Sequence, residues 1–361
     1  MGKKKVLISM SGGIDSSVAA VLLLEQGYEL IGITFRSWDY ISDSCIAKKT
    51  GCCDVESVLE AKNLAEKLGF EHHILDFRDS FKEIVINNFI GEYLAGRTPN
   101  PCVVCNSHIK WGKIIEFADL HHCDYIASGH YAIIKNSNNK YYISTAKDQN
   151  KDQSYFLWNL TQNQLKRTIF PLGGLTKDEV RNIAIDKNLE YLNKKKESQE
   201  ICFIPDNDYR KFLKDHVPGI EAKFAGGNIV STDGKILGRH KGYPFYTIGQ
   251  RKGLEYAAGH PMYVVKTDAV KNLVVLGEKT ELEKSELTVS PFNLQKYSSL
   301  PDGLTVETKI RYRSKPAEGF LIMEEGKIHI TFNHAVSAIT PGQSAVFYEK
   351  GDLVGGGIIL K

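Results

Sequence analysis

Short apolar runs alternate with helix-like patterns through roughly the first third of the chain, and this alternation restricts the fold more than any other feature. The strand-like runs cover 5–9, 29–35, 72–77 and 125–128. The helical patterns cover 15–26, 54–68, 81–94 and 109–118. Strands that alternate with helices of this length form a parallel sheet with helices on both faces. We therefore predict an N-terminal α/β domain with a doubly wound parallel sheet, whose ligands bind beyond the carboxyl ends of the strands.

The second half of the chain has a different character. At 361 residues the chain is too long for one ordinary domain, and its composition shifts near residue 205. Helical patterns at 177–188 and 209–216 give way, from Asn228 onward, to evenly spaced short strands with turn signals. We predict an α/β domain over 1–204, a small mixed central domain over 205–280 and a C-terminal β-barrel over 281–361.

The string from Ser9 to Ser17 lies between the first predicted strand and the first predicted helix. Its two glycines allow backbone N–H groups to close on an anion, and the start of the helix adds a favourable partial charge. Asp15 could help to hold a hydrated magnesium ion on bound phosphates. The alternative is a glycine turn with Asp15 or Ser16 as a helix cap. Neither a Walker-type loop nor a dinucleotide-binding glycine pattern occurs, which disfavours P-loop hydrolases and dehydrogenases.

Charge and cysteine usage limit the partners and the compartment. The formal net charge is only +3, so any contact with RNA must come from local patches such as Lys194–Lys196. The apolar stretch after Met1 is too short for a signal peptide or a membrane span. Seven cysteines, an odd number, without a secretory signal indicate thiols rather than a disulfide framework. We expect a cytoplasmic protein.

Two strings of the sequence contain cysteines that are candidates for a reactive thiol. The first runs from Gly96 to Asn106 and contains Cys102 and Cys105, and its prolines keep the loop extended. We expect Cys105 to precede a helix, whose N-terminal partial charge would lower the pKa of the thiol, as a nucleophile requires. The second string contains Cys202.

Two metal-binding alternatives remain open for these thiols. Cys102, Cys105 and Cys202 could hold an iron–sulfur cluster with an open position, although we do not favour this. A zinc site would need further ligands. The residues that could complete a zinc site are His108, Cys52 and Cys53.

The loop from Ser9 to Ser17 resembles the pyrophosphate-binding loop of the ATP-pyrophosphatases. Five further strings extend the likeness along the chain: Ser128–Tyr131, Lys151–Leu157, Thr247–Gly253, Arg311–Arg313 and Pro341–Ala345. Together with the cysteine strings they resemble the tRNA-specific 2-thiouridylase family almost end to end. The resemblance implies that ATP is bound by Ser9, Met10, Ser11, Gly12, Gly13, Ile14, Asp15, Ser16, Phe35 and Gly129.

The resemblance also implies the reaction. The C2 oxygen of a tRNA uridine is adenylated by ATP with Mg²⁺, and sulfur then arrives from a persulfide on Cys202, loaded by an upstream donor protein. Cys105 is the nucleophile and forms a transient disulfide with Cys202. The family points to wobble position 34 of the tRNAs for Lys, Glu and Gln. One departure is Cys102, where many members carry Asp, so the acid/base role of that position is open.

The tRNA contacts implied by the resemblance lie in three groups. Asn100, Pro101 and Cys102 belong to the first cysteine string, and Lys151, Asp152 and Gln153 lie beside the ATP domain. The remaining implied contacts are His130, Arg311, Tyr312 and Gln343. Arginine and lysine bind phosphates, and a target base in a loop is extruded before it reacts.

Two other functional classes fit parts of the sequence. A small-molecule synthetase of the ATP-pyrophosphatase type would release AMP without RNA and would not need Cys105 or Cys202. A tRNA-binding module with a vestigial nucleotide loop would bind RNA and release no pyrophosphate. The dependence of pyrophosphate release on tRNA separates all three.

Overall fold

The computed structural model describes residues 2–38, 55–194, 201–204, 206–254, 256 and 259–360. The chain divides into two compact units, each made of several segments. Unit 1 comprises Met1–Val85, Cys102–Asn207 and Gly351–Val354. Unit 2 comprises Ile86–Pro101, Asp208–Lys350 and Gly355–Lys361. The predicted domain boundaries at 204 and 280 stay a prediction.

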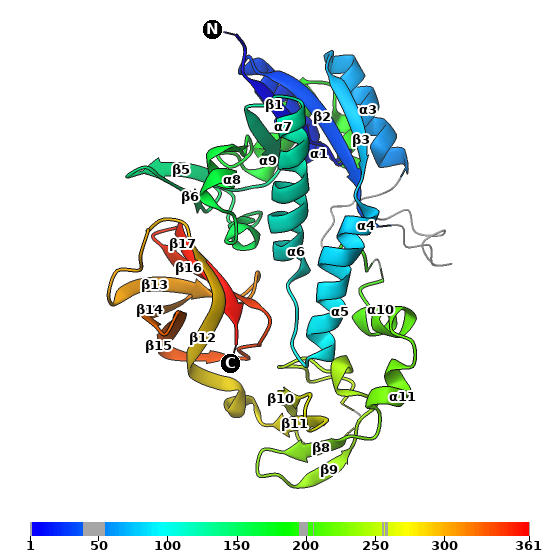
Figure 1. Cartoon of the computed structure of the whole chain (residues 1–361), viewed down its shortest axis with the longest axis vertical. Helices are drawn as coiled ribbons and strands as arrows, with labels where there is room; N and C mark the ends of the chain where they lie inside the picture. The colour runs from blue at the N-terminus through cyan, green and yellow to red at the C-terminus, as the bar shows by residue number, and fades with distance from the viewer. Residues whose placement is uncertain are drawn as a thin grey trace. The chain divides into compact units, whose positions relative to one another are not determined.

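A five-stranded parallel sheet forms the centre of unit 1 (Figure 1). Its order is β3 (Glu71–Asp76), β2 (Glu29–Arg36), β1 (Lys5–Ser9), β4 (Tyr125–Ser128) and β7 (Thr168–Ile169). On one face Val6 and Ile8 of β1 are buried against three helices. These are α1 (Ile14–Glu25), α3 (Val55–Leu68) and α9 (Lys177–Asp186). Leu7 points to the opposite face by strand alternation and is also buried, so the sheet is covered on both sides. This confirms the predicted fold class for the first domain.

The helix that carries the first cysteine string begins earlier than predicted. It runs as α6 (Pro101–Val104), a π-helical segment η2 (Cys105–Lys113) and α7 (Ile114–Leu120). Proline favours the first position of a helix, where its missing N–H group has no partner to lose, so Pro101 starts the helix. The expectation that Cys105 precedes the helix is therefore wrong. Cys102 lies in the first turn, and Cys105 lies in the second.

The other helices and hairpins of unit 1 surround this frame. The sequence patterns missed the hairpin of β5 (Ile133–Ser137) and β6 (Lys140–Ser144). Its turn has Asn138 and Asn139 at positive φ, the geometry that asparagine adopts in tight hairpins. The remaining elements are α4 (Arg78–Phe81), η3 (Ser154–Leu157), α8 (Gln162–Lys166) and η4 (Glu190–Lys194). The segment η1 (Lys82–Ile86) leads from α4 to α5 (Asn87–Leu94), which belongs to unit 2.

Unit 2 contains a small mixed sheet. Its order is β10 (Tyr263–Asp268), β11 (Leu273–Gly277), β8 (Asn228–Ser231) and β9 (Ile236–Arg239). The strands β11 and β8 are parallel and the other two pairs are antiparallel. The helical elements of this part are α10 (Tyr209–His216), α11 (Ile220–Phe224), η5 (Tyr243–Phe245) and η6 (Lys279–Leu282).

The last six strands of the chain form an antiparallel barrel, which belongs to unit 2 except for the start of its last strand. The strands are β12 (Glu283–Leu294), β13 (Leu304–Lys309), β14 (Ala317–Glu324), β15 (Lys327–Ser337), β16 (Ser344–Glu349) and β17 (Asp352–Ile359). Their order is β12-β15-β14-β13-β16-β17, and β12 also pairs with β17, for example Val289 with Ile359. Closure leaves this barrel without exposed edges, and Leu321 and Ile330 are buried side chains of it. The predicted C-terminal β-barrel is confirmed.

Membrane insertion has no support in the helices that the structure describes, since none of them is long and apolar enough to cross a bilayer.

Candidate functional site

The loop between β1 and α1 has the geometry of an anion cradle. Gly12 has φ +68°, and a Cβ atom there would lie 2.2 Å from the carbonyl oxygen of Ser57 in α3. Only glycine fits such a position. Gly13 precedes α1 and has no side chain with which to cap it. No side chain that the structure describes caps the start of α1, so the N–H groups of its first turn are available to an anion, and their role in phosphate binding stays a prediction.

Serine hydroxyls hold this loop in shape. The Oγ atoms of Ser16 and Ser17 donate to the carbonyl oxygen of Gly13 at 3.1 and 2.9 Å. The backbone N–H of Ser11 donates to Ser16 Oγ at 3.1 Å. Gly129, which directly follows β4, lies against the start of α1, where a Cβ atom on Gly129 would be 2.8 Å from the backbone nitrogen of Ser16. The structure thus brings the predicted loop residues and Gly129 together.

Asp15 has two partners that sequence reasoning missed. Its carboxylate accepts hydrogen bonds from Lys177 Nζ at 2.7 and 2.9 Å and from Tyr131 Oη at 2.8 Å. The Lys177 side chain is only 6 % exposed, so its charge is aimed at this carboxylate rather than at solvent. The sequence did contain a signal for where Lys177 lies. Thr176 and Glu179 form a capping box, which places Lys177 in the first turn of α9.

The donor set around Asp15 does not form a metal site by itself. Its carboxylate is already bonded to an ammonium group, and the described residues contain no group of three or more His, Cys, Asp or Glu side chains that could hold a metal ion. The same observation applies to Cys102, Cys105 and Cys202, which do not form such a group. Cys52 and Cys53 lie outside the described residues.

The other residues predicted to contact ATP line the ends of β1 and β2. Met10 and Ile14 are buried, and the Met10 carbonyl accepts a hydrogen bond from Thr34 Oγ1 at 2.8 Å. Phe35 of β2 is half-buried and lies 6.1 Å from Phe77 between ring centroids. These residues lie at the carboxyl edge of the sheet, where ligands of open α/β sheets bind.

The thiol helix, meaning α6, η2 and α7 together, has several anchors to the rest of unit 1. Asn106 Nδ2 donates to the carbonyl of Phe156 at 3.1 Å. Trp111 Nε1 donates to Thr168 Oγ1 at 2.7 Å, and Gln164 donates to the Trp111 carbonyl at 2.7 Å. Cys102 and Cys105 are both half-buried. The helix backbone is therefore fixed while its two thiols stay accessible.

Cys202 occupies a short described segment after η4. The thiol is exposed, whereas the next two side chains, Phe203 and Ile204, are buried. The ring of Phe203 packs edge to face on Phe81 with centroids 5.8 Å apart. This contact anchors the segment that carries the exposed Cys202 to unit 1. Lys195 and Lys196 of the basic run precede it and lie outside the described residues.

His130 is part of a polar chain beside the thiol helix. Its Nε2 lies 3.4 Å from Lys110 Nζ, and its Nδ1 lies 2.7 Å from Ser128 Oγ. A protonated lysine can only donate, so Nε2 accepts and Nδ1 carries the proton. Burial and, second, the charge of Lys110 hold the pKa of His130 well below its usual value. His130 is thus a neutral imidazole next to a cation.

Three implied tRNA contacts form a turn after β6. Asp152 is buried, and its carboxylate accepts hydrogen bonds from Ala146 N at 3.0 Å and from Ser154 Oγ at 2.7 Å. Gln153 exchanges two hydrogen bonds with the backbone of Tyr131. Lys151 is half-buried. In this structure Asp152 and Gln153 shape the turn, which leaves the Lys151 ammonium as its cationic group.

The remaining implied contacts belong to unit 2. Arg311 and Tyr312 follow β13 and are half-buried, and Arg311 Nη2 donates to the Ala338 carbonyl at 2.6 Å. Gln343 donates from Nε2 to the carbonyls of Thr98 and Pro99. Asn100 is buried, and Pro101 starts the thiol helix.

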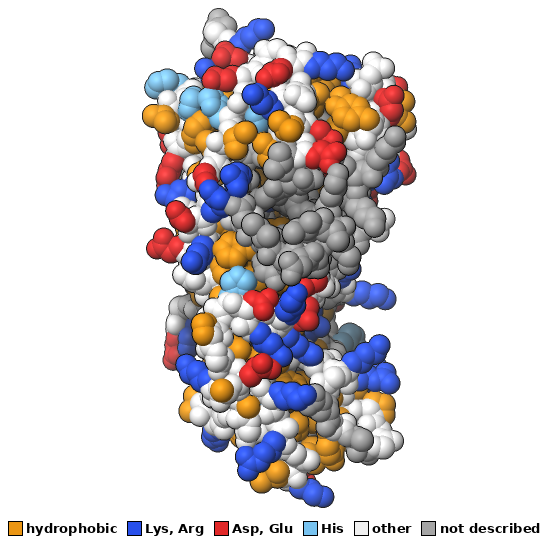
Figure 2. Space-filling view, turned by 90° about the vertical axis from the view of Figure 1, so that its right-hand side faces the viewer, with side chains coloured by type: hydrophobic (Ala, Val, Ile, Leu, Met, Phe, Trp, Pro, Cys, Tyr) orange, Lys and Arg blue, Asp and Glu red, His pale blue; other side chains and the backbone are white. Residues whose placement is uncertain are grey.

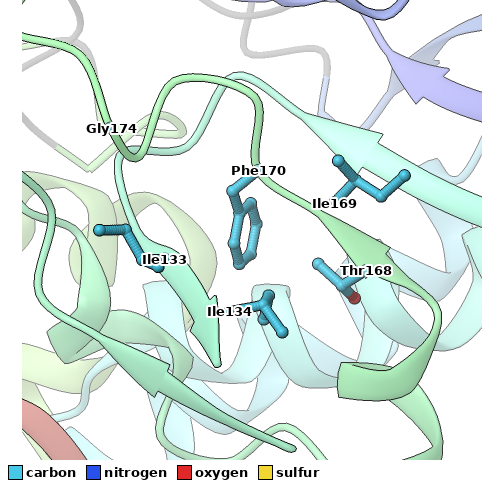
Figure 3. A pocket seen from close by; sticks show the side chains of 6 residues that line it. All are labelled: Ile133, Ile134, Thr168, Ile169, Phe170 and Gly174. Carbon is cyan, nitrogen blue, oxygen red and sulfur yellow. The ribbon is translucent and has the colours of Figure 1, made fainter. Parts of the chain in front are cut away.

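A cavity of about 300 Å³ lies between β5 and β7. Ile133 and Ile134 line it from β5, and Figure 3 shows the Phe170 ring between them and Ile169. The ring of Phe170 lies 6.0 Å from that of His130. The side chains that line it are apolar except for Thr168, and none of them is charged, so no cation there could pair with a phosphate.

Family models match three successive parts of the chain. Residues 4–206 match the tRNA methyl transferase HUP domain, 210–278 the tRNA methyl transferase PRC-barrel domain, and 284–359 the aminomethyltransferase beta-barrel domain. The molecule thus combines a HUP-type parallel-sheet domain, a central PRC-barrel domain and a C-terminal closed β-barrel.

Curated relatives match over nearly the whole length. The tRNA-specific 2-thiouridylase MnmA of Amoebophilus asiaticus is 51 % identical over 360 residues, covering 99 % of this chain and 96 % of that protein. The MnmA protein of Cytophaga hutchinsonii is 49 % identical, covering 99 % and 98 %. A solved 4-thiouridine synthetase–RNA complex with bound ATP is 17 % identical over 60 % of this chain and 51 % of that one, with a TM-score of 0.34, too low to bear on the site.

Proposed function

The chain belongs to the tRNA-specific 2-thiouridylase family, and we propose that it thiolates C2 of a tRNA uridine by adenylation followed by sulfur transfer from a Cys202 persulfide. That the family thiolates tRNA uridine follows from the full-length identity to its curated members. The two steps and the residues below are the proposal. The observation that carries it is the uncapped β1–α1 loop in the same unit as Cys102, Cys105 and Cys202.

In the first step the uridine C2 oxygen attacks the α-phosphate of ATP. Pyrophosphate leaves, the N3 proton of uridine is lost, and the C2 oxygen becomes an adenylate that can depart as AMP. The N–H groups at the start of α1 and the Ser11 hydroxyl would bind the negative charge of the phosphates, and the absence of a side-chain cap at Gly13, the residue before α1, supports this role. Lys177 adds a cation next to the same helix terminus.

Mg²⁺ enters this proposal as the usual companion of ATP. The residues of the loop offer one carboxylate, Asp15, which Lys177 and Tyr131 already engage. A magnesium ion would therefore be held chiefly by the nucleotide's own phosphates, with Asp15 as its protein ligand. Bound there, it would neutralise charge on the leaving pyrophosphate.

In the second step sulfur replaces the adenylate oxygen. One route has the Cys105 thiolate attack the Cys202 sulfur of the persulfide, which forms a Cys105–Cys202 disulfide and releases hydrosulfide. The hydrosulfide then attacks C2 and AMP leaves. In the other route the terminal persulfide sulfur attacks C2 first, and Cys105 then forms the disulfide and frees the C2 thiocarbonyl. Both routes end with the same products, and a thiol reductant restores the two cysteines.

The RNA partner would be bound by local cations rather than by the whole surface. Figure 2 shows Lys and Arg side chains mixed with Asp and Glu on the visible face. Basic residues outnumber acidic ones between 209 and 252, and Lys151 and Arg311 lie in the predicted contact segments. The tRNAs for Lys, Glu and Gln, modified at position 34, and a persulfide-loading donor protein remain parts of the proposal that come from the family resemblance.

The test is pyrophosphate release from ATP by the purified full chain with and without unmodified tRNA. We expect release only when a substrate tRNA is present. Release without RNA would indicate a small-molecule synthetase, and RNA binding without any release would indicate a binding module. Either result contradicts the proposal.

A further inference from the structure

The barrel turn Pro341–Gln343 forms hydrogen bonds to the segment that leads into the thiol helix, which we call the gripped segment (94–99). The backbone N–H of Thr98 donates to the Pro341 carbonyl at 2.9 Å. Gln343 Nε2 donates to the carbonyls of Thr98 and Pro99 at 3.1 and 2.7 Å. All of these residues belong to unit 2. Both hydrogens of the Gln343 amide group are therefore directed to the main chain of 98–99.

The approach at this turn is too close for any side chain at its centre. Gly342 has φ +88°, and a Cβ atom there would lie 2.8 Å from the Thr98 carbonyl oxygen and 3.0 Å from Arg97 Cβ. The turn is itself fixed to the end of β17, because Gly342 N donates to the Ile359 carbonyl at 2.9 Å. The barrel therefore supports the turn.

The preceding residues of the gripped segment have similar anchors in unit 2. Tyr243 Oη donates to the Leu94 carbonyl at 2.5 Å, and Thr267 Oγ1 donates to the Gly96 carbonyl at 2.7 Å. Arg97 forms an ion pair with Glu92. The main-chain carbonyls of Leu94, Gly96, Thr98 and Pro99 thus each accept a hydrogen bond from a side chain of unit 2.

The gripped segment ends where the sulfur chemistry of the proposed function begins. Pro101 starts the thiol helix, Cys102 follows it, and Cys105 lies one turn later. A shift of residues 98–99 would move the first turn of that helix, and small displacements of reacting groups are costly to catalysis.

We propose that the Pro341–Gln343 turn is a positioning element for the thiol helix, and that it acts through the hydrogen bonds that Gln343 donates to the main chain of Thr98 and Pro99. This inference rests on the proposed function only for the role of the thiols. The hydrogen bonds between the turn and the gripped segment are present in the protein without RNA.

The sharpest variant is Gly342→Ala, which inserts a methyl group against the Thr98 carbonyl. The matched control is Gly326→Ala, because Gly326 has φ +70° in another barrel turn and a Cβ atom there meets nothing within 4 Å. Both variants place an alanine at a positive φ, but only Gly342→Ala also meets the Thr98 carbonyl, so a larger effect of Gly342→Ala reports that contact. Gln343→Glu is the second variant, since it replaces the donating amide by an acceptor that faces two carbonyls.

The readout is the alkylation rate of Cys102 and Cys105 in the full chain without tRNA, followed by peptide mass spectrometry. We expect Gly342→Ala and Gln343→Glu to change the Cys105 rate by more than about threefold, with Cys202 and the Gly326→Ala protein within about twofold of wild type. Thiolation kcat should fall in the same two variants, and tRNA affinity should stay near wild type in Gly342→Ala, which leaves the Gln343 side chain intact.

Two results would overturn the inference. Unchanged thiol reactivity together with weakened tRNA binding would mean that Gln343 contacts RNA directly. Equal effects of Gly342→Ala and Gly326→Ala would mean that only backbone strain matters. If the protein proves not to thiolate tRNA, the alkylation rates still decide the inference, so the two failures are distinguishable.

Discussion

At the scale of single residues, the partner of Asp15 changes how the phosphate loop works. An aspartate next to a nucleotide loop is expected to face a metal ion, yet here it accepts hydrogen bonds from Lys177 and Tyr131. Lys177 is 162 positions away in sequence. Since the lysine side chain is almost fully buried beside the loop, removing its charge would leave the carboxylate poorly compensated.

We expect Lys177→Met to lower tRNA-dependent pyrophosphate release by at least about tenfold, because a charge-assisted hydrogen bond near the phosphates is lost. Steady-state release assays at saturating tRNA give the effect on kcat and on the KM for ATP. Lys177→Arg should retain part of the activity, since it keeps the charge.

A matched control exists on the same pair of helices. Lys187 and Glu25 form an ion pair at the C-terminal ends of α9 and α1, whereas Lys177 and Asp15 lie at the N-terminal ends. Both side chains of the Lys187–Glu25 pair are exposed. Lys187→Met removes an ion pair of little energetic value and should leave release near wild type. Equal activity of the two methionine variants would remove Lys177 from the nucleotide site.

At the scale of elements, the start of the thiol helix decides between its two cysteines. The helix N-terminal partial charge acts within the first turn, so it favours a thiolate at Cys102 more than at Cys105. The expectation that Cys105 precedes the helix, and is therefore the thiol favoured by the helix partial charge, is wrong. The assignment of Cys105 as the nucleophile thus rests on the family resemblance alone.

Parallel substitutions separate the two thiols. We expect Cys105→Ser to abolish 2-thiouridine formation, with tRNA-dependent pyrophosphate release retained, because adenylation precedes sulfur transfer. Cys102→Asp should keep most of the thiolation, and Cys102→Ser is the control for a lost half-buried thiol. Mass spectrometry of digested tRNA measures the product. Loss of thiolation in Cys102→Ser with normal product from Cys105→Ser would reverse the assignment.

The sequence predicted the elements whose signals are local. The strands β1–β4 and the helix α1 were predicted from apolar spacing, and the tight loop between β1 and α1 was predicted from two glycines at a strand end. The β5–β6 hairpin was missed because its strands are short and its turn uses Asn138–Asn139 rather than glycine. The early start of the thiol helix was missed because proline was taken as a loop residue, whereas it also favours the first position of a helix.

At the scale of the whole molecule, the division of the chain into two units cannot be predicted from local sequence patterns. The segment Ile86–Pro101 belongs to unit 2, although it lies between two stretches of unit 1 in sequence. The thiol helix therefore begins at a boundary between the units. The contacts that create this division join residues more than 140 positions apart, such as Leu94 with Tyr243 and Thr98 with Gln343. Spacing along the chain carries no signal for them.

The proposed reaction requires both cysteines and both steps in one chain. Adenylation must consume one ATP for each sulfur transferred, and the persulfide sulfur can be delivered only if Cys105 and Cys202 become joined. The central claim is thus a covalent link that appears once per turnover.

The most direct measurement is a single turnover of persulfide-loaded protein with ATP and substrate tRNA, without reductant. Peptide mass spectrometry then quantifies the Cys105–Cys202 disulfide beside the pyrophosphate and the 2-thiouridine. The account predicts equal amounts of all three products, and no disulfide when tRNA is omitted. Formation of 2-thiouridine while Cys105 and Cys202 remain unlinked would contradict it.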